Sequence, residues 1–564
     1  MSDTTNPNTS GDGAPLTTNN SSSSTSSAAA PVEKKLTPKE LRMLEKAKAA
    51  AEQEAAKAAL EAAAAEANKN IYGEATLCMS QEHTNKVWTR VQDLSATKIG
   101  DSSLPVTVLV RARVHSVRET AKVVFVTLRQ AYSTVQACVF KGNNKDLFKF
   151  VASISKESVV DVFGTLEKVD QPILSATQTD VELQVQTCFI ISKAAAILPF
   201  QLEDASRSDV LYAEQEKEEA LAIAEGRTPP VKYVSVSQDT RLDYRWIDLR
   251  TPANQAIMRI SSGVCQLFRD FLISKNFVEI QTPKILGGAS EGGSSVFHLK
   301  YFGDDACLAQ SPQLYKQMCA ACSDLERVFE IGPVFRAENS NTHRHLCEFH
   351  GLDLEMVINE HYYEVLDVFS DLFIYIFDGL ATKFRKELEA VRAQHPFEDL
   401  QYCRPSLRIT YAEGIKMLKD GGWDINYGDD LSTAQERALG AMVKTKYATD
   451  FFMMDRYPMS IRPFYTMPCP DDPLLSNSYD FFIRGEEIVS GAQRVHEPEL
   501  LTKQAREKGV PPESIKSYID SFRHGALPHG GGGVGLERVV MLSLGLPNIR
   551  KASMFPRDPK RLFP

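Results

Sequence analysis

A strongly charged stretch lies between two apolar runs near the middle of the chain. It reads GPVFRAENSNTHRHLCEFHGLDLEM and spans residues 332–356. A hairpin of two half-buried strands needs only a short turn, typically Asn-Gly or Asp-Gly, and this stretch has neither. Arg336 and Arg344 carry guanidinium groups, which stay ionised at any working pH and bind phosphate through paired hydrogen bonds. The stretch therefore predicts a loop that binds an anion.

Two later segments also combine charge with glycine. In YDFFIRGEEIVSGAQR, Asp480 and Glu487 offer the hard carboxylate oxygens that Mg²⁺ prefers, and Arg494 follows on the same segment. In HGGGGVGLERVVM, the glycines allow the backbone to approach a ligand closely, and Arg538 adds a fixed cation. Each segment alone could be an ion-paired surface. Together with the charged loop they predict one polyphosphate site with Mg²⁺.

The spacing of these residues excludes two common nucleotide-binding motifs. Gly530, Gly532 and Gly535 formally satisfy G-x-G-x-x-G. That fingerprint requires a βαβ unit and an acidic residue about twenty positions later, and only some thirty residues remain. The P-loop pattern G-x-x-x-x-G-K-[ST] does not occur in the chain. Any ATP is therefore expected to be held by arginines.

Length and composition predict a multidomain protein of ordinary globular type. A chain of 564 residues is too long for one hydrophobic core and should form two or three domains. Its 43% hydrophobic and 24% charged residues are typical of soluble globular proteins. The net charge of -9 excludes a surface that is basic throughout, but leaves room for a local RNA-binding surface.

The N-terminal hundred residues are expected to lie outside the folded core. Residues 1–32 are rich in Ser, Thr, Asn and Ala and predict a disordered tail. Residues 33–69 are rich in Ala, Glu and Lys and predict a helical extension, and residues 70–100 a linker. Within 33–57 there are seven basic residues against five Glu. This balance allows weak contact with phosphates, and it equally suits a solvated spacer helix.

Residues 101–200 predict an all-β domain of the OB-fold type. Five runs alternate apolar and polar residues, VTVLVRARV, KVVFVTLRQ, TVQACVF, SVVDVFGTLEKV and VELQV, and a helical segment, KDLFKFVASIS, separates the third from the fourth. This order suits a small Greek-key barrel whose open face often binds oligonucleotides. Phe125 and Gln136 could stack on and hydrogen-bond to unpaired bases. The strand pattern alone equally allows Phe125 to be a core residue.

The rest of the chain predicts a hinge followed by a large α+β domain. Residues 201–245 are polar and charged and contain Pro229-Pro230, which favours a hinge. Residues 246–564 mix helices with strands that look mainly antiparallel. A helix is expected from Pro252, with one apolar face formed by residues 257, 260, 264, 267, 268 and 271.

Cysteine usage and the N-terminal sequence predict a cytoplasmic protein. The ten cysteines have no regular spacing and form no disulfide framework, which suits a reducing compartment. The single C-x-x-C, Cys319 to Cys322, has no second pair at zinc-ligand spacing, so a structural role is expected. The first residues do not resemble a secretory signal, and no apolar run is long enough to span a membrane.

From about residue 100 to 564 the chain resembles the class II aspartyl-tRNA synthetases of the cytoplasmic eukaryotic, fungal-like type. FVEIQTPKILGGASEGGSSVF resembles motif 1 and the loop that closes over the substrate. FRAENSNTHRHLCEFHGLDLEM resembles motif 2, and GGGVGLERVVM resembles motif 3. The resemblance implies an OB-fold anticodon-binding domain, an antiparallel catalytic sheet, and a homodimer built through the helix at 253–275 and Pro283.

The resemblance also implies roles for residues at matching positions. Catalysis would rest on Arg336, Glu487 and Arg538. ATP would be bound by Arg336, Ala337, Glu338, Arg344, His345, Leu346, Glu487, Gly535, Leu536, Glu537 and Arg538. Aspartate would be bound by Glu291, Gln313, Lys316, Arg336, Asp353, Ser490 and Arg494. tRNA would meet Phe125, Gln136, Glu182, Ser340 and Thr342, and Mg²⁺ would be held by Asp480 and Glu487.

Three functions remain open on the sequence. The resemblance implies an ATP-dependent aspartate–tRNA ligase. Asparaginyl enzymes share much of the scaffold, but a pocket with Lys316 and Arg494 favours a substrate with a charged side chain. A non-catalytic RNA-binding paralogue is the other alternative, and the presence of both Arg336 and Arg538 disfavours it.

Overall fold

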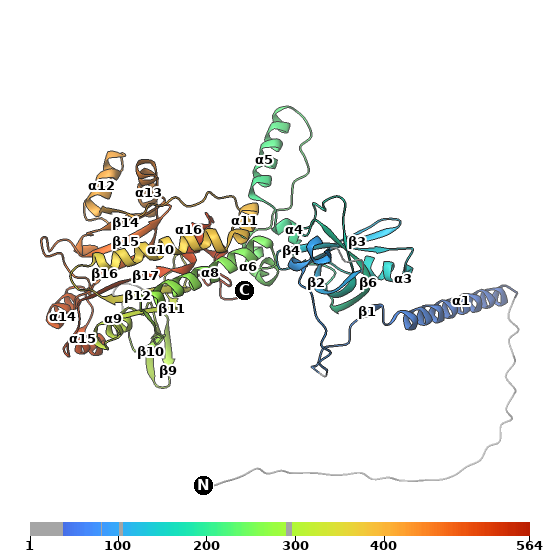
Figure 1. Cartoon of the computed structure of the whole chain (residues 1–564), viewed down its shortest axis with the longest axis horizontal. Coiled ribbons are helices and arrows are strands. Elements are labelled where there is room, and N and C mark those ends of the chain that lie inside the picture. Colours follow the sequence, from blue (N-terminus) through green and yellow to red (C-terminus); the bar gives the residue numbers. More distant parts are fainter. Residues whose placement is uncertain (1–37, 81, 101–104, 289–295) are drawn as a thin grey trace, which may run out of the picture. The chain divides into compact units, whose positions relative to one another are not determined.

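The computed structural model describes residues 38–80, 82–100, 105–288 and 296–564. The chain divides into two compact units, residues 1–72 and 73–564. In the first unit, α1 (Pro38–Asn68) is a continuous helix of 31 residues, which matches the predicted helical extension over the part described (Figure 1). The tail predicted for residues 1–32 lies outside the described residues.

Five strands of a six-stranded sheet, counted over the described residues, form a barrel in the N-terminal part of the second unit. Its sheet order is β6-β4-β3-β2-β5, and a β5–β6 pairing closes it. The helix α3 follows the third barrel strand, as the sequence predicts for an OB-fold. The elements are β2 (Val106–Glu119), β3 (Val123–Gln130), β4 (Ser133–Phe140), α3 (Lys145–Ala152), β5 (Val159–Lys168) and β6 (Val181–Ser192).

The alternation of apolar and polar residues along the barrel strands separates the core from the outer face. On β3, Val124, Val126 and Leu128 are buried, while Phe125 between them is half-buried on the other face. At Gly164 a Cβ atom would lie 2.1 Å from the carbonyl oxygen of Gln184, so the β5–β6 crossing requires glycine there.

The segments predicted as linker and hinge contain short elements of their own. The linker region holds β1 (Tyr72–Glu74), η1 (Val91–Asp93) and α2 (Ala96–Ile99), and Val91 and Leu94 are fully buried. The hinge region holds α4 (Leu202–Ala205), α5 (Asp209–Ala224), α6 (Gln238–Asp243) and α7 (Arg245–Asp248). Among the described residues of α5, only Ala222 is buried. The helix therefore lacks the apolar stripe by which a helix is usually predicted from sequence.

An eight-stranded sheet, counted over the described residues, carries the second half of the unit. Its order is β13-β14-β15-β16-β17-β12-β11-β7. The β13–β14 and β7–β11 pairs are parallel and the others are antiparallel, which confirms the predicted mainly antiparallel sheet. The strands are β7 (Val278–Glu279), β11 (Arg327–Phe335), β12 (Glu348–Val357), β13 (Leu407–Thr410), β14 (Phe451–Asp455), β15 (Ser478–Ile483), β16 (Glu486–Gln493) and β17 (His529–Gly535).

The helices α8 (Pro252–Ser274), α10 (Tyr363–Lys383) and α16 (Leu536–Ser543) pack together against this sheet and share its main hydrophobic core (Figure 1). As predicted, Pro252 opens α8, and residues 257, 260, 264, 267, 268 and 271 are all buried. Among the described helices, none is both long enough and apolar enough to cross a membrane.

Other elements surround this core. A small sheet of order β8-β10-β9 is formed by β8 (Ile285–Leu286), β9 (His298–Tyr301) and β10 (Asp304–Leu308). The remaining helices are α9 (Gln313–Cys322), α11 (Arg385–Gln394), α12 (Tyr411–Asp420), α13 (Thr433–Tyr447), α14 (Pro498–Glu507) and α15 (Lys516–Phe522). Three short 3₁₀ turns within the described residues are η2 (Met459–Ile461), η3 (Pro512–Ile515) and η4 (Ile549–Lys551).

The ten cysteines all lie within the described residues and are free thiols. Cys319 and Cys322 occupy the last turn of α9, where burial raises the pKa of both thiols. Cys322 packs against a buried cluster that includes Tyr518 and Phe522. These surroundings fit the structural role predicted for the C-x-x-C segment.

Candidate active site

One cavity of about 340 Å³ is lined by residues from all three charged segments. The predicted residues that line it are Gln313, Arg336, Glu338, Arg344, His345, Leu346, Asp353, Glu487, Ser490, Arg494, Gly535, Glu537 and Arg538. The predicted residues of this domain that do not line it are Lys316, Ala337, Ser340, Thr342, Asp480 and Leu536. Glu291 lies outside the described residues.

Strand register brings the segments together. In the sheet, Gly533 on β17 pairs with Asp353 on β12 and with Ser490 on β16, so these three positions lie abreast. Gly531, also on β17, must lack a side chain because a Cβ atom there would lie 2.4 Å from a carboxylate oxygen of Glu355. The glycines therefore leave room for side chains from the two neighbouring strands.

Arg336, Arg344 and Arg538 converge on one end of the cavity. The loop after β11 starts at Arg336, whose backbone N–H donates to the carbonyl of Cys347 at 2.8 Å. Arg538 lies in the first turn of α16 and donates from Nη1 to the carbonyl oxygen of Glu487 at 2.9 Å. Burial lowers the pKa of Arg538, and the charges of Arg344 and Arg336 act in the same direction. Cations held this close favour a polyanion between them.

His345 and the hydroxyl residues of the loop form a small cluster at this end. The Nδ1 atom of His345 lies 2.6 Å from Oγ1 of Thr342 and 3.2 Å from Oγ of Ser340. Burial lowers the pKa of His345, and the positive charges of Arg538 and Arg344 add to the effect. The imidazole is therefore neutral at pH 7. Its Nδ1 atom can donate a hydrogen bond to these hydroxyl groups or accept one from them, depending on the tautomer.

Glu487 and Asp480 have different surroundings. Asp480 accepts hydrogen bonds from Arg462 at 2.6 and 3.1 Å. The carboxylate of Glu487 has its nearest cation, Arg538, 4.0 Å away. Burial, with a further contribution from the charge of Asp480, raises the pKa of Glu487 to about 7. No group of three or more His, Cys, Asp or Glu side chains with the arrangement of a metal site occurs within the described residues.

The other end of the cavity is built from two buried ion pairs. Lys316 Nζ lies 2.9 Å from Asp353 Oδ1 and 3.6 Å from Glu355 Oε2. Arg494 donates to Glu355 at 2.8 and 3.2 Å, and to the carbonyl of Gly531 at 2.8 Å. Burial opposes ionisation of Glu355, but the charges of Arg494 and Lys316 lower its pKa. These four side chains therefore form a fixed array of alternating charge.

The guanidinium of Arg494 keeps one nitrogen available at this end. Its Nε and Nη2 atoms make the contacts to Glu355 and Gly531, and Nη2 also lies 3.4 Å from Oε1 of Gln313. Its Nη1 atom has no hydrogen bond to any residue that the structure describes. A second carboxylate entering from the cavity would therefore meet a donor that is already oriented.

Sequence reasoning missed Glu355, Arg462 and Glu436, which bind Arg494, Asp480 and Arg344. A signal existed for Glu355, because it follows Asp353 by two residues and must share its face of β12. No local pattern marks Arg462 or Glu436. Their partners lie 18 and 92 residues away in the sequence.

On the barrel, the residues predicted to bind tRNA share one outer face. Gln136 pairs in register with Glu182, and its side-chain amide donates to that carboxylate at 2.6 Å. Gln136 also pairs with Thr127 of β3, which lies on the same face as Phe125. The guanidinium carbon of Arg118 lies 4.7 Å from the centre of the Phe125 ring. Phe125 is therefore a face residue, and the alternative that it belongs to the core is wrong.

Comparison with known proteins identifies the family. Residues 237–559 match the family described as tRNA synthetases class II (D, K and N), and residues 108–191 match the OB-fold nucleic acid binding domain. The chain is 54% identical over 498 residues to a cytoplasmic aspartate–tRNA ligase of Homo sapiens, with 88% of this chain and 95% of the relative covered.

Solved structures agree with this assignment. An aspartyl-tRNA synthetase from Entamoeba histolytica superposes with a TM-score of 0.79 at 49% identity, covering 87% of this chain and 96% of that one. An asparaginyl-tRNA synthetase from Pyrococcus horikoshii, in complex with asparaginyl-adenylate, gives a TM-score of 0.70 at 29% identity, covering 86% and 100%. The chain thus belongs to the class II tRNA synthetases of the D, K and N group.

Proposed function

We propose that the protein is a cytoplasmic aspartate–tRNA ligase, which forms aspartyl-adenylate from L-aspartate and ATP and transfers the aspartyl group to the 3′ end of tRNA(Asp). The observation that carries the proposal is the single cavity with two different ends. One end gathers Arg336, Arg344 and Arg538, and the other holds Lys316 and Arg494 against buried carboxylates. Relatives more than 50% identical over 88% of the chain support the choice of aspartate.

Arg336, Glu487 and Arg538 are proposed to be the catalytic residues. The substrate carboxylate attacks the α-phosphorus of ATP, pyrophosphate leaves, and no protein nucleophile is required. The enzyme must align two anions, the substrate carboxylate and ATP, and stabilise the charge that develops on the phosphate oxygens. Fixed cations can do both. Arg336 would contact the α-phosphate and Arg538 the γ-phosphate.

The remaining residues at this end would border the nucleotide. His345 and Leu346 lie with Arg344 on the loop that lines the cavity, and they would flank the adenine. Glu338, on the same loop, and Gly535 and Glu537, at the start of α16, also line this space. Ala337 and Leu536 do not line the cavity and are proposed to flank the nucleotide next to Arg336 and Gly535, which do.

Arg494 and Lys316 are proposed to select aspartate. The free Nη1 donor of Arg494 suits the side-chain carboxylate of aspartate, while Gln313, Asp353 and Ser490 line the space around it. An asparagine side chain has an N–H donor in place of one carboxylate oxygen, and this donor would face the guanidinium with no acceptor, which is costly. The same pocket therefore disfavours an asparaginyl enzyme.

Asp480 and Glu487 are proposed to hold a divalent cation, expected to be Mg²⁺. The side chain of Glu487 is 35% exposed and its nearest cation is 4.0 Å away, so the residues fit a cation whose other ligands are oxygens of ATP. When bound, the cation would neutralise charge on the phosphates. Arg462 holds Asp480 in place by its paired hydrogen bonds.

tRNA and a second copy of the chain are the proposed macromolecular partners. The outer face of the barrel, with Phe125, Gln136 and Glu182, would bind the anticodon, and Ser340 and Thr342 would meet the acceptor end. A homodimer is proposed through the surface around α8, where Ile273, Val278 and Ile285 are 54%, 43% and 49% exposed. Sedimentation at micromolar concentration tests this assembly, and a monomer would contradict it.

Two assays test the proposed activity. In ATP–pyrophosphate exchange, aspartate should support exchange and asparagine should support at least about a thousandfold less. In charging assays, purified tRNA(Asp) should accept aspartate. Exchange that depends on asparagine would assign the asparaginyl function instead. Absence of exchange with either amino acid, from a protein that still binds tRNA, would indicate a non-catalytic RNA-binding protein.

A further inference from the structure

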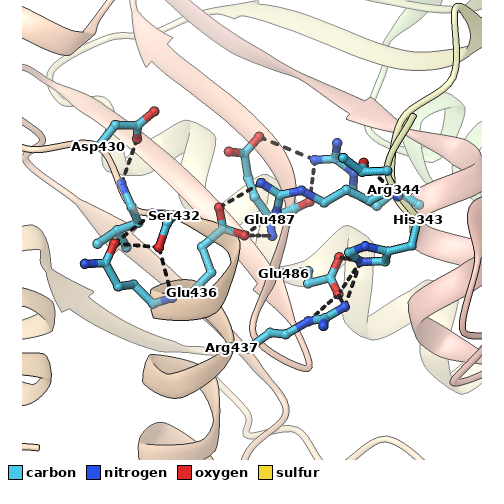
Figure 2. A network of polar contacts seen from close by, with 12 residues as sticks. His343, Arg344, Asp430, Ser432, Glu436, Arg437, Glu486 and Glu487 are labelled. Atoms are coloured by element: carbon cyan, nitrogen blue, oxygen red, sulfur yellow. Dashed lines mark hydrogen bonds and ion pairs between the residues drawn. The ribbon is translucent and has the colours of Figure 1, made fainter. Parts of the chain in front are cut away.

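The helix α13 reaches the ATP end of the cavity from outside the three motif segments. Glu436, in its first turn, is 5% exposed and accepts hydrogen bonds from Arg344 Nη1 at 2.6 Å and Nη2 at 3.3 Å. The same carboxylate lies 3.5 Å from the backbone nitrogen of Glu487. Figure 2 shows the side chain of Glu436 pointing toward Arg344 and Glu487. One side chain of α13 therefore contacts both the charged loop and β16.

The next residue of α13 makes a parallel set of contacts. Arg437 donates to Glu486 Oε1 from Nε at 2.9 Å and from Nη2 at 2.6 Å. Its Nη2 atom also lies 2.7 Å from Nε2 of His343, which is 3.2 Å from Glu486. Consecutive residues of α13 thus join consecutive residues of the loop to consecutive residues of β16, as Figure 2 shows.

The position of α13 is fixed by close packing. At Gly440 a Cβ atom would lie 2.3 Å from the Cα atom of Gly485, in the turn between β15 and β16. Gly485 has a φ of +76°, and a Cβ atom there would lie 2.9 Å from the Cα atom of Arg437. At its N-terminus, α13 is closed by a capping box between Ser432 and Gln435. The helix therefore cannot slide or rotate without separating Glu436 and Arg437 from their partners.

Glu436 determines where the guanidinium of Arg344 lies. Among the described residues, the hydrogen bonds of that guanidinium go to Glu436 alone, and its buried Nε atom has no partner. Arg344 also lies close to Arg538, whose pKa its charge lowers. Without the carboxylate, repulsion between these cations would favour other rotamers of Arg344.

We infer that Glu436 and Arg437 are positioning residues of the ATP site, which act from α13 by holding Arg344 and His343 in the orientation that receives the nucleotide. The inference rests on the proposed function. ATP then meets a loop that is already ordered, and binding does not have to include the entropy cost of ordering it. Aspartate binds at the other end of the cavity and should not depend on α13.

Substitutions on α13 test this role. Glu436→Ala and Arg437→Gln should each raise the KM for ATP in pyrophosphate exchange by about tenfold, while the KM for aspartate stays within about twofold. Glu436→Gln, which keeps the shape but not the charge, should fall between wild type and Glu436→Ala. Lys446→Gln is the matched control, because it removes a charge from the exposed last turn of the same helix. An unchanged or lowered KM for ATP in Glu436→Ala would overturn the inference.

A double-mutant cycle shows whether Glu436 acts through Arg344. In an Arg344→Ala background, Glu436→Ala should weaken ATP binding no further, as measured by calorimetry with Mg²⁺ and ATP. An equal loss in both backgrounds would overturn the positioning role. Calorimetry with ATP needs no aspartate, so it tests α13 even if exchange shows that the proposed amino-acid substrate is wrong. Melting temperatures of the variants identify any that fail to fold.

Discussion

The two ends of the cavity both use cations, but they hold them differently. At the amino-acid end, the side chains of Lys316 and Arg494 are 1% and 3% exposed and are paired with carboxylates buried to the same degree. At the ATP end, Arg344 and Arg538 are 14% and 21% exposed, and Arg538 has its nearest carboxylate 4.0 Å away. Each cation of the first end is paired with a buried carboxylate; at the second end Arg344 is paired with Glu436, but Arg538 has no carboxylate within hydrogen-bonding distance, so this end retains positive charge.

This difference separates selection from catalysis. A closed array of charges has already lost its hydration during folding, so its geometry is set before the substrate enters. Such a site can discriminate aspartate from the isosteric asparagine. However, the same side chains then serve both substrate binding and the stability of the fold. An end with unneutralised cations instead keeps its electrostatic attraction for the triphosphate. Variants at the first end should therefore lose both folding stability and amino-acid selection, and loss of Arg538 at the second should lower the rate with little loss of stability.

The largest effect is expected at the amino-acid end. Arg494→Leu should reduce aspartate-dependent pyrophosphate exchange by roughly 10⁴-fold, because the proposed partner of the substrate carboxylate is lost. It should also lower the free energy of unfolding by about 3–5 kcal/mol, because Glu355 is left buried with one cation removed. Denaturant titration and exchange kinetics measure the two effects.

A second substitution separates these effects. Adding Glu355→Gln to Arg494→Leu removes the unpaired charge, so it should recover part of the lost stability while exchange stays absent. Near-normal exchange in the single variant would remove Arg494 from the site. Full stability in that variant would contradict the closed array of charges.

The next effect is expected at the ATP end. Arg538→Ala should lower kcat for exchange by about 10²–10³-fold, since it removes a cation that stabilises developing phosphate charge. Its free energy of unfolding should change by less than about 1 kcal/mol, because no carboxylate within hydrogen-bonding distance loses a partner. A large loss of stability, as measured by denaturant titration, would show that the two ends do not differ in the way described.

These contrasts explain which parts of the molecule could be predicted from the sequence. The barrel strands and α8 carry their signal locally, in the period of apolar residues and in Pro252 at the first helical position. The residues that line the cavity could be named because glycine and arginine cluster in three short segments. Strand pairing then brings those segments together, as between Gly533, Asp353 and Ser490.

The parts that sequence reasoning missed depend on contacts between distant segments. Glu436 pairs with Arg344 only because α13 packs on the β15–β16 turn, and nothing near position 436 indicates this. The segment FVEIQTP, residues 277–283, forms a strand of only two residues, since beyond Ile280 the backbone N–H of Thr282 donates to the Glu330 side chain and not to a strand. A carboxylate thus replaces the neighbouring strand as the hydrogen-bond acceptor. The spacing of apolar residues in the sequence cannot show such a replacement.

A smaller effect is expected from pH, again at the ATP end. Because the pKa of Glu487 is raised to about 7, the group is partly protonated at neutral pH, and a cation must displace the proton. Affinity for Mn²⁺ in the presence of ATP should therefore increase by about tenfold from pH 6 to pH 8. The pKa of Glu355 is lowered, so the ionisation of Glu355 should not change aspartate binding over this range.

Stability gives an independent test of the same pKa. A carboxyl whose pKa is higher in the folded than in the unfolded protein destabilises the folded state once it is ionised. Glu487→Gln should therefore raise the melting temperature above pH 7 and have little effect below about pH 5. A pH-independent affinity for Mn²⁺ in the wild type, or a variant of lower stability at pH 8, would contradict the raised pKa.

The smallest effect is expected in the helical extension. Deletion of residues 1–68 should leave pyrophosphate exchange unchanged, because activation of aspartate needs only the cavity. If the basic residues contact phosphates, the deletion should make the slope of log K for tRNA binding against log salt shallower by about one to three units. A full-length variant separates charge from spacing by carrying K34Q, K35Q, K39Q, R42Q, K46Q, K48Q and K57Q. The same shallower slope in that variant would assign the extension to phosphate contact, whereas an unchanged slope in both would make α1 a spacer.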